Sequence, residues 1–524
     1  MKTKLLFLFS LILVGGNCLG QIMFQKVIRG GNYSRVFAVQ QTMDSGYILT
    51  GYITRPDSNG TDVLLIKTNE EGNTLWTKTF GGTSTEAGYS VVQTTDSGYI
   101  IAASSGSFGQ NGDMYVIKTN AIGDTLWTKA YGGTNADGGY FMRQTNDGGY
   151  IISGGTRSFG AGGEDIYLLK TDAVGAIQWT KTYGGINDEQ GDYITQTSDS
   201  GYIICGYTKS FGAGDADVYL IKTKANGDTL WTKTYGGAND EYGNAVQQTS
   251  DGGYIITGFT GSFGAGNDDV YLIKTNLNGD TLWTKTYGGT DNDYGNDVRQ
   301  ASDGGYIISG ITASFGAGAS DVYLIKTDTN GNVLWTKTYG GTGNDYAYSV
   351  GQTMDEGYVM AGATNSFLTA NDNSDVYLIK TDANGNNDCY QGNANTIVSY
   401  TATHVASTHT VISSGGSVSM TTTVVGSADN DSTLCLSVGI KELSINNTIS
   451  IYPNPVTDQL IIDGNWKTNK TMKLTIYNIS GKTIHTEVIS SKQESINCSP
   501  YPAGVYFIIV ADENKQWVGR FVKE

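Results

Sequence analysis

The side chains best suited to chemistry are carboxylates that recur at fixed places in a repeated segment. A first set lies four residues after a Gly-Gly pair: Glu86, Asp137, Glu189, Glu241, Asp293 and Asp345, with Arg35 at the matching place near the start of the chain. A second set follows a glycine-rich stretch: Asp62, Asp113, Asp165, Asp217, Asp269, Asp321 and Asp375. Hard cations take oxygen ligands, so the first set contains candidate calcium ligands. The alternative is that each carboxylate accepts backbone N–H bonds in its own turn, and recurrence in every copy favours it.

Other catalytic chemistry is restricted by what the repeats lack. No histidine occurs between Gln21 and Tyr400, which excludes Ser-His-Asp and Cys-His arrangements and a histidine metal cage from that region. Cys205 stands where other copies carry Thr, Ala or Ser, so we expect a small buried residue. We therefore expect no cofactor, with calcium as the one candidate ion.

The repeat itself predicts the architecture. A Gly-Tyr pair begins at Gly46, Gly98, Gly149, Gly201, Gly253, Gly305 and Gly357, a spacing of 52 residues with a single 51, and such a period indicates a propeller or a solenoid. Each period holds four runs rich in Val, Ile, Tyr and Thr, for example 242–249, 254–260, 269–275 and 282–287. The second run, GYIITG, does not alternate, so its strand should be covered on both faces, as in radially stacked blades.

Seven copies of the first three runs occur, but the last copy lacks its fourth run, which elsewhere reads WTKTYGG. The stretch 24–31 is similar to that run, so we expect the N-terminal strand to complete the seventh blade and close the ring. The repeat resembles that of secreted bacterial seven-bladed β-propellers, which implies a fold and not an activity. The recurrent Trp of the fourth run should lie in the outermost strand.

Residues 1–20 resemble a secretory signal peptide, with Lys2 and Lys4 before an apolar run. The propeller should then occupy 21–388, and a Thr/Ser-rich segment at 389–443 is typical of a linker. In an exported protein Cys389 and Cys435 would form a disulfide. By closing the loop between them, this bond would stabilise the folded state by about 4 kcal/mol in the chain-entropy model. The alternative is two unpaired thiols at the ends of a flexible linker.

Residues 444–524 carry a different set of motifs. They are Tyr452, Pro453, Asn454, Pro455, Gly481, Gly504, Tyr506 and Lys523, among short alternating strands. The segment resembles the type A C-terminal sorting domain of type IX secretion cargo and should form a small β-sandwich. The resemblance implies a partner in the type IX machinery and a place outside a Gram-negative cell, secreted or on its surface.

The sequence predicts the ligand less clearly than it predicts the fold. The chain has 33 Lys and Arg against 50 Asp and Glu and no basic stripe, which argues against nucleic acid as a partner. The loop after the second run breaks the symmetry with Arg55, Arg157 and Lys209, which are candidates for a binding rim. We expect a monomeric, non-enzymatic module for adhesion or scaffolding that binds glycan, protein or matrix. The alternatives are a polysaccharide hydrolase or lyase using carboxylates on one face, and a structural spacer.

Overall fold

The computed structural model describes residues 21–524 except for 31–32, 56–59, 369–372, 388, 395, 401–403, 408–410, 414–416, 421–423, 427–430, 440–448, 465–471, 479–481, 492 and 512–515. Of the strands between 399 and 439 it describes the backbone. The predicted signal peptide and Gly481 lie outside these residues. In the described part every regular element is a β-strand. No helix that is long and apolar enough to cross a membrane occurs among these residues.

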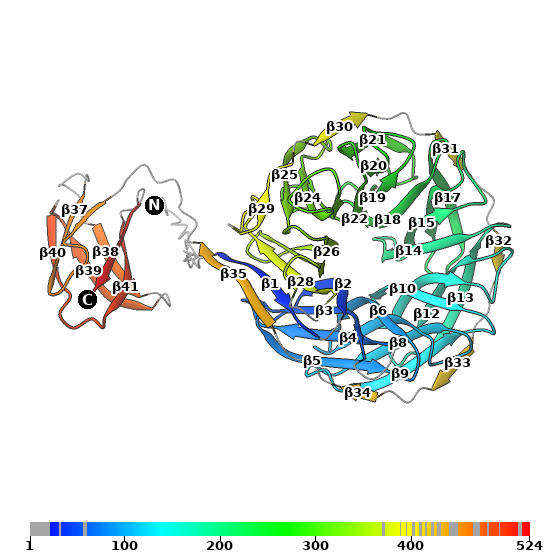
Figure 1. Cartoon of the computed structure of the whole chain (residues 1–524), viewed down its shortest axis with the longest axis horizontal. Helices are drawn as coiled ribbons and strands as arrows, with labels where there is room; N and C mark the ends of the chain where they lie inside the picture. Colours follow the sequence, from blue (N-terminus) through cyan, green and yellow to red (C-terminus); the bar gives the residue numbers. More distant parts are fainter. Residues whose placement is uncertain are drawn as a thin grey trace, which may run out of the picture. The chain divides into compact units, whose positions relative to one another are not determined.

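Seven antiparallel blades surround a central axis (Figure 1). The innermost strands are β2 (Ser34–Gln41), β6 (Glu86–Gln93), β10 (Asp137–Gln144), β14 (Glu189–Gln196), β18 (Glu241–Gln248), β22 (Asp293–Gln300) and β26 (Asp345–Gln352). The second strands are β3 (Tyr47–Thr54), β7 (Tyr99–Ser105), β11 (Tyr150–Thr156), β15 (Tyr202–Thr208), β19 (Tyr254–Thr260), β23 (Tyr306–Thr312) and β27 (Tyr358–Thr364). Blades 1 to 7 are numbered in this order.

The outer half of each blade completes the four expected runs. The third strands are β4 (Thr61–Thr68), β8 (Asp113–Thr119), β12 (Asp165–Thr171), β16 (Asp217–Thr223), β20 (Asp269–Thr275), β24 (Asp321–Thr327) and β28 (Asp375–Thr381). The fourth strands are β5 (Thr74–Gly81), β9 (Thr125–Gly132), β13 (Ile177–Gly184), β17 (Thr229–Gly236), β21 (Thr281–Gly288), β25 (Val333–Tyr339) and β1 (Gln21–Ile28). Six of the seven residues of β19 are buried, so the second strand is covered on both faces as the missing alternation predicts.

The ring closes where the N-terminal strand joins the last blade. β1 pairs antiparallel with β28, from Phe24 opposite Lys380 to Ile28 opposite Val376. The prediction that the N-terminal strand completes the seventh blade is confirmed. Hydrogen bonds between neighbouring blades continue across this joint, because the Met354 N–H of blade 7 donates to Gln41 Oε1 of blade 1 at 2.9 Å.

The same bond recurs between every pair of neighbouring blades. The glutamine that ends each innermost strand accepts from a backbone N–H in the hairpin of the preceding blade at 2.8–3.1 Å, through Gln41, Gln93, Gln144, Gln196, Gln248, Gln300 and Gln352. At the outer side, the Tyr235 hydroxyl of β17 donates to the Gly279 carbonyl of the next blade at 2.7 Å. Each blade is therefore joined to the next at its inner side, and blades 2 to 6 are joined to the next at their outer side as well.

A fifth strand on each blade comes from the segment that we predict to be a linker. These strands are β29 (Gln391–Gly392), β30 (Ile397–Tyr400), β31 (His404–Ser407), β32 (Val411–Ser413), β33 (Ser417–Met420), β34 (Val424–Gly426) and β35 (Asp431–Gly439). They add in turn to blades 6, 5, 4, 3, 2, 1 and 7 (Figure 1). We call β29 to β35 the girdle, because it passes every blade in reverse order.

The girdle corrects two expectations. The segment 389–443 is not a free linker, and the Trp-bearing strands β5, β9, β13, β17, β21 and β25 are not the outermost. Each of these strands offers its outer edge to a girdle strand, for instance Tyr235 opposite Val405 and Tyr183 opposite Ile412. Short runs of Ser, Thr and Val suffice, because backbone groups make these ladder bonds and such residues favour extended chain.

The chain divides into two compact units, Ile22–Val438 and Gly439–Glu524. In the second, β36 (Ile449–Tyr452), β37 (Gln459–Gly464) and β40 (Gln493–Asn497) form one sheet. The other contains β38 (Met472–Asn478), β39 (Thr483–Ile489), β41 (Gly504–Ala511) and β42 (Gln516–Lys523). Leu460, Leu474, Tyr506 and Phe521 from both sheets share one buried core, which is the β-sandwich that we expect. The Asn454 side chain binds the backbone of β42 at Arg520 and Val522.

The cysteines fall into two groups. Cys205 and Cys498 are free and buried, whereas Cys389 is disulfide-bonded. Cys389 lies beside blade 7, since its carbonyl accepts from Gln25 of β1, and β35 adds to that same strand. Cys435 belongs to β35, but its side chain is outside the described part, so the Cys389–Cys435 pairing stays a prediction. Such a bond would join the two ends of the girdle.

Replacing Cys389 with Ser should loosen the girdle. We expect a lower thermal unfolding midpoint and faster proteolysis between 397 and 439, with a loss of up to about 4 kcal/mol in the chain-entropy model. The matched control is Cys498→Ser, which removes a free thiol from the other unit. Equal midpoints and cleavage rates for Cys389→Ser and the unmodified mature protein would contradict a disulfide that joins the two ends of the girdle.

Candidate functional site

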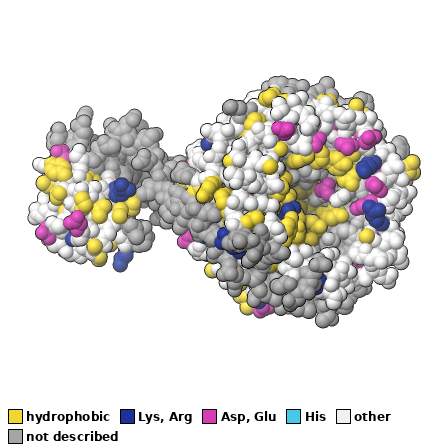
Figure 2. All heavy atoms as spheres, in the orientation of Figure 1, with side chains coloured by type: hydrophobic (Ala, Val, Ile, Leu, Met, Phe, Trp, Pro, Cys, Tyr) yellow, Lys and Arg dark blue, Asp and Glu magenta, His cyan; other side chains and the backbone are white. Residues whose placement is uncertain are grey.

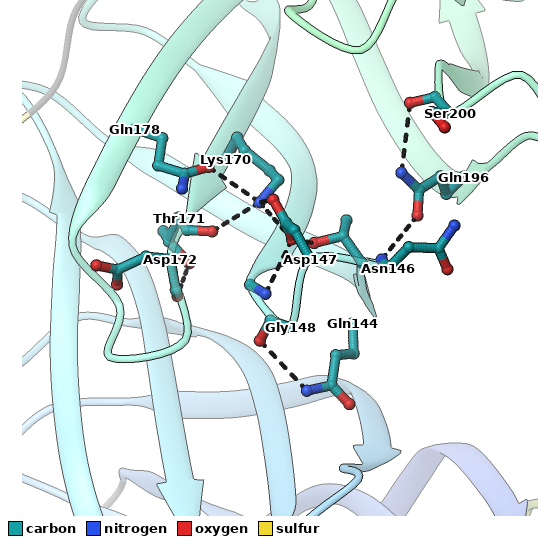
Figure 3. A network of polar contacts seen from close by, with 12 residues as sticks. Gln144, Asn146, Asp147, Gly148, Lys170, Thr171, Asp172, Gln178, Gln196 and Ser200 are labelled. Atoms are coloured by element: carbon teal, nitrogen blue, oxygen red, sulfur yellow. Dashed lines mark hydrogen bonds and ion pairs between the residues drawn. The ribbon is translucent and has the colours of Figure 1, made fainter.

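One face of the propeller is occupied by structural ion pairs. In blade 3 the buried Lys170 ammonium contacts the Asp147 carboxylate at 2.9 Å and donates to the Thr171 carbonyl at 2.9 Å (Figure 3). Partial burial opposes ionisation of Asp147, but bonds from Thr145, Lys170 and the Gly149 N–H outweigh it and lower the pKa of Asp147 to about 2. The seven pairs are Lys67–Asp44, Lys118–Asp96, Lys170–Asp147, Lys222–Asp199, Lys274–Asp251, Lys326–Asp303 and Lys380–Asp355. Because every blade has one, they serve the fold.

The predicted calcium ligands lie at the opposite ends of the innermost strands, where each belongs to a hydrogen-bonded turn. Glu241 accepts from the Gly237 N–H at 2.6 Å, the Thr260 hydroxyl at 2.7 Å and the Ser262 N–H at 3.0 Å. It shares this place with Asp217 of the preceding blade. A Cβ on Gly236 would lie 2.0 Å from Asp217 Oδ1 and 2.5 Å from Glu241 Oε2, so only glycine lets the two carboxylates meet there.

Arginine side chains contact two of the strand-opening aspartates. Arg29 reaches Asp375 and Arg55 reaches Asp62, each at 3.7 Å. No group of three or more His, Cys, Asp or Glu side chains in the described part is arranged to hold a metal ion. The six candidates named from the sequence are thus each engaged within their own blade junction, and calcium binding stays a prediction.

These pairs make stability depend on pH. Burial, together with the charge of Asp137, raises the pKa of Asp113 to about 6 despite a bond from the Gln110 N–H, and burial with Asp345 raises that of Asp321 to about 6. Since the folded state holds these protons more tightly than the unfolded state, their stabilisation is present below about pH 4 and is lost as the pH rises to about 6.

We therefore expect the free energy of unfolding of the mature protein to fall between about pH 4 and 6.5, measured from urea titrations at a series of pH values. The double variant Asp113→Asn and Asp321→Asn mimics the protonated state and should reduce this slope. A free energy that rises across this range, or a slope unchanged in the double variant, would contradict the assignment.

The predicted binding rim is dispersed. The Arg55 guanidinium donates to the carbonyls of Gly82 and Ser84 in the next blade, so it joins blades 1 and 2. Arg157 pairs with Glu164 at 2.9 Å, and Lys209 is exposed. The three residues lie on blades 1, 3 and 4, and their role in binding stays a prediction.

A more concentrated feature lies around the central axis, where each innermost strand contains a β-bulge. In blade 2, Gly88 faces Ala103 and Ser90 faces Ala102, so Tyr89 has no partner in the ladder. The residues placed in this way are Phe37, Tyr89, Tyr140, Asp192, Asn244, Asn296 and Tyr348. A bulge redirects a side chain, and all seven are partly exposed, which makes this bulge ring the candidate site.

The bulge ring is asymmetric. Blades 7, 1, 2 and 3 contribute the aromatic arc, which consists of Tyr348, Phe37, Tyr89 and Tyr140 in this order around the axis. The centroids of neighbouring rings along the arc are 5.1 Å, 5.2 Å and 5.4 Å apart. Blades 4, 5 and 6 contribute the polar arc of Asp192, Asn244 and Asn296. Figure 2 shows the propeller hollowed at its centre, with hydrophobic side chains gathered around the hollow.

An acidic cluster adjoins the polar arc. Burial and the charge of Glu164 together raise the pKa of Asp192 to about 7, against a lowering bond with Gln190. Glu164 lies over Gly155, and a Cβ added to this glycine would lie 2.0 Å from Glu164 Oε1. Tyr140 lies over Gly138 in the same way, and a Cβ added there would lie 2.7 Å from the Tyr140 hydroxyl. Glycines replace the larger side chains of other blades here, so the sequence makes room for this cluster on blades 3 and 4.

Sequence reasoning missed the bulge ring, although a signal for it exists. The fourth position of the innermost strand varies among Phe, Tyr, Asp and Asn, while the glutamine that ends the strand is constant. Variation at one register of an otherwise regular repeat marks a place where the blades differ in role. The sequence alone does not show that this fourth position is a bulge, because a bulge depends on how two strands pair.

Comparison with known proteins defines the class. Residues 450–524 match the family model of the secretion system C-terminal sorting domain. The protein is therefore an exported β-repeat protein with a type IX sorting domain, a partner of the type IX machinery, and is secreted or attached at the outer surface of a Gram-negative cell. The prediction of the sorting domain is confirmed.

One other sequence and several solved structures show weaker similarity to this chain. Regulatory protein FlaEY of Caulobacter vibrioides is 25% identical over 236 residues, which is 40% of this chain and 24% of that protein. PorZ, a surface component of the type IX system of Porphyromonas gingivalis, has a TM-score of 0.38 at 10% identity over 93% of this chain and 59% of its own. A fungal alcohol oxidase of the AA5 family in complex with copper has a TM-score of 0.40 at 10% identity over 96% and 99%. The chain spans about a quarter of the matched relative, and none of these similarities assigns an activity.

Proposed function

We propose that the protein is a non-enzymatic, monomeric module at the cell surface or in the medium that binds a glycan in the bulge ring. The observation that carries the proposal is the pairing of an aromatic arc with a polar arc across one hollow. Aromatic rings offer apolar faces to the C–H faces of sugars, and a few amide and carboxylate groups can fix the hydroxyl groups. The Asn244 and Asn296 amides are held in place by bonds to the Gly295 and Ala347 carbonyls of the next blades.

Rigidity supports the same conclusion. Each bulged side chain stands on an innermost strand of a closed ring, and the Arg35 guanidinium fixes the Tyr348 hydroxyl at 3.1 Å. Arg35 also lies 5.8 Å from the centre of the Tyr348 ring. A site built on strands loses little conformational entropy when a ligand binds.

Replacing Tyr89 with Ala tests the proposal, since it removes the middle of the aromatic arc. On a glycan array and then by calorimetry, we expect the mature protein to bind at least one glycan and Tyr89→Ala to bind it about tenfold or more weakly, a cost of about 1.4 kcal/mol or more. The matched control is Tyr390→Ala, which removes an exposed aromatic ring outside the bulge ring. Glycan binding unaffected by Tyr89→Ala would refute the site.

A second candidate function is a polysaccharide hydrolase or lyase, and Asp192 with Glu164 is the observation that favours it. A carboxyl group with a pKa of about 7 is protonated in part at neutral pH and can act as a general acid, while a nearby carboxylate acts as base or nucleophile. Unlike the junction carboxylates, this pair occurs on blades 3 and 4 alone among the described residues. Tyr140 and Tyr207 lie beside it.

Reducing-sugar release from a polysaccharide panel distinguishes the two functions. If the protein is an enzyme, the mature chain releases product at a rate that falls above about pH 7, and Asp192→Asn lowers kcat by at least a hundredfold while KM changes little. If it is a binding module, no polysaccharide yields product although one of them binds.

A further inference from the structure

Two arginines from blades 3 and 6 meet inside the ring, beyond the bulge ring. Arg143 of β10 lies three residues past the bulged Tyr140, and Arg299 of β22 lies three past Asn296, about 10 Å further along each strand. Arg143 Nη2 donates to the Tyr193 hydroxyl at 2.8 Å, and Arg299 Nη1 donates to the same hydroxyl. One phenol oxygen of blade 4 thus holds two guanidinium groups close together.

The charges at this place do not balance. Arg299 pairs with Asp297 at 3.1 Å, and Asp297 is also bound by the Val350 N–H. Arg143 makes no ion pair with any carboxylate in the described part of the chain. The charges that act on these groups are the two guanidiniums and Asp297, so the cluster carries one uncompensated positive charge inside a protein of net charge −17. Two like charges this close are unfavourable unless an anion joins them.

The geometry of Arg143 is fixed before any ligand arrives. Its guanidinium lies 4.3 Å from the centre of the Phe141 ring, and Phe141 stacks on Tyr193 at 3.6 Å. Arg143 and Arg299 are nevertheless only partly buried, so part of each residue reaches solvent. The matching position is uncharged in the other five blades, where it carries Gln40, Val92, Thr195, Gln247 and Gly351.

We propose that Arg143 and Arg299 form a carboxylate-binding clamp inside the ring of blades. A guanidinium presents parallel N–H donors that match the two oxygens of a carboxylate, and a monoanion would neutralise the single excess charge. The clamp goes beyond glycan binding, because it takes a free carboxylate as well as the carboxylate of a uronic acid. An oligosaccharide that contains a uronic acid would reach the clamp and the aromatic arc together, since both line the same hollow.

Calorimetry of the mature chain in low-chloride buffer at pH 7 tests the clamp with sodium acetate, sodium D-glucuronate and neutral D-glucose. We expect saturable binding of acetate and tighter binding of D-glucuronate, both weakened at least tenfold in Arg143→Gln. Arg520→Gln removes an exposed arginine in the sorting domain and is the matched control for lost charge; it should bind as the unmodified protein does. Tyr193→Phe, which keeps the ring but releases both guanidiniums, should weaken binding as well and serves if Arg143→Gln does not fold.

The outcomes separate the two proposals. Acetate and D-glucuronate binding without any glycan binding at the aromatic arc would support the clamp and refute the glycan proposal. D-glucose binding as strongly as D-glucuronate would refute the clamp and leave the aromatic arc in place. Absence of carboxylate binding by the folded protein, or equal binding by Arg143→Gln and Arg520→Gln, would overturn the clamp.

Discussion

The antiparallel pairing of β1 with β28 is the constraint on which the rest of the propeller depends. Without those ladder bonds blade 7 would end in an open edge, and the Gln41 bond to blade 7 would have no partner in register. Closure also places Gln25 beside Cys389, where the girdle starts, and offers β1 to β35, where it ends. The two ends of the propeller sequence and the two ends of the girdle therefore meet at one blade. A single joint fixes the ring, the hollow inside it and the outermost strands around it.

Symmetry separates structure from function in this protein. The Lys–Asp pairs, the glutamine bridges and the junction carboxylates occur in every blade or nearly every blade, and each is explained by bonds within a blade or to its neighbour. The bulge ring shares their sevenfold placement but not their residue types, because it passes from Tyr348, Phe37, Tyr89 and Tyr140 to Asp192, Asn244 and Asn296. The arginine pair departs further, since two blades of seven carry it. Ligand chemistry is concentrated where the repeat is broken, on the strands nearest the axis.

Much of the fold follows from the sequence. The seven blades and their closure were predicted from a period of 52 residues, the absence of alternation in GYIITG and the similarity of 24–31 to the fourth run. The sorting domain was predicted from the order of motifs from Tyr452 onward. The girdle was missed because all its strands but β35 are only two to four residues long and lie in a Thr/Ser-rich segment. Their starts at Ile397, His404, Val411, Ser417, Val424 and Asp431 are nevertheless six or seven residues apart. The bulge ring and the arginine pair depend on register between strands and on proximity across the ring, which no local pattern reports. The sequence did predict that function should be sought where symmetry fails, although it directed attention to Arg55, Arg157 and Lys209.

Amide hydrogen exchange tests most directly whether the centre of the ring is the ligand site. The mature chain would be followed with and without an oligosaccharide that contains D-glucuronate. The bulged residues leave the ladder, so the amides around them can respond when a ligand covers them. We predict slower exchange in peptides from β2, β6, β10 and β26, with no change in the hairpins of the Lys–Asp pairs or in the girdle. Protection confined to the loops that carry Arg157 and Lys209, or to the girdle, would contradict the account.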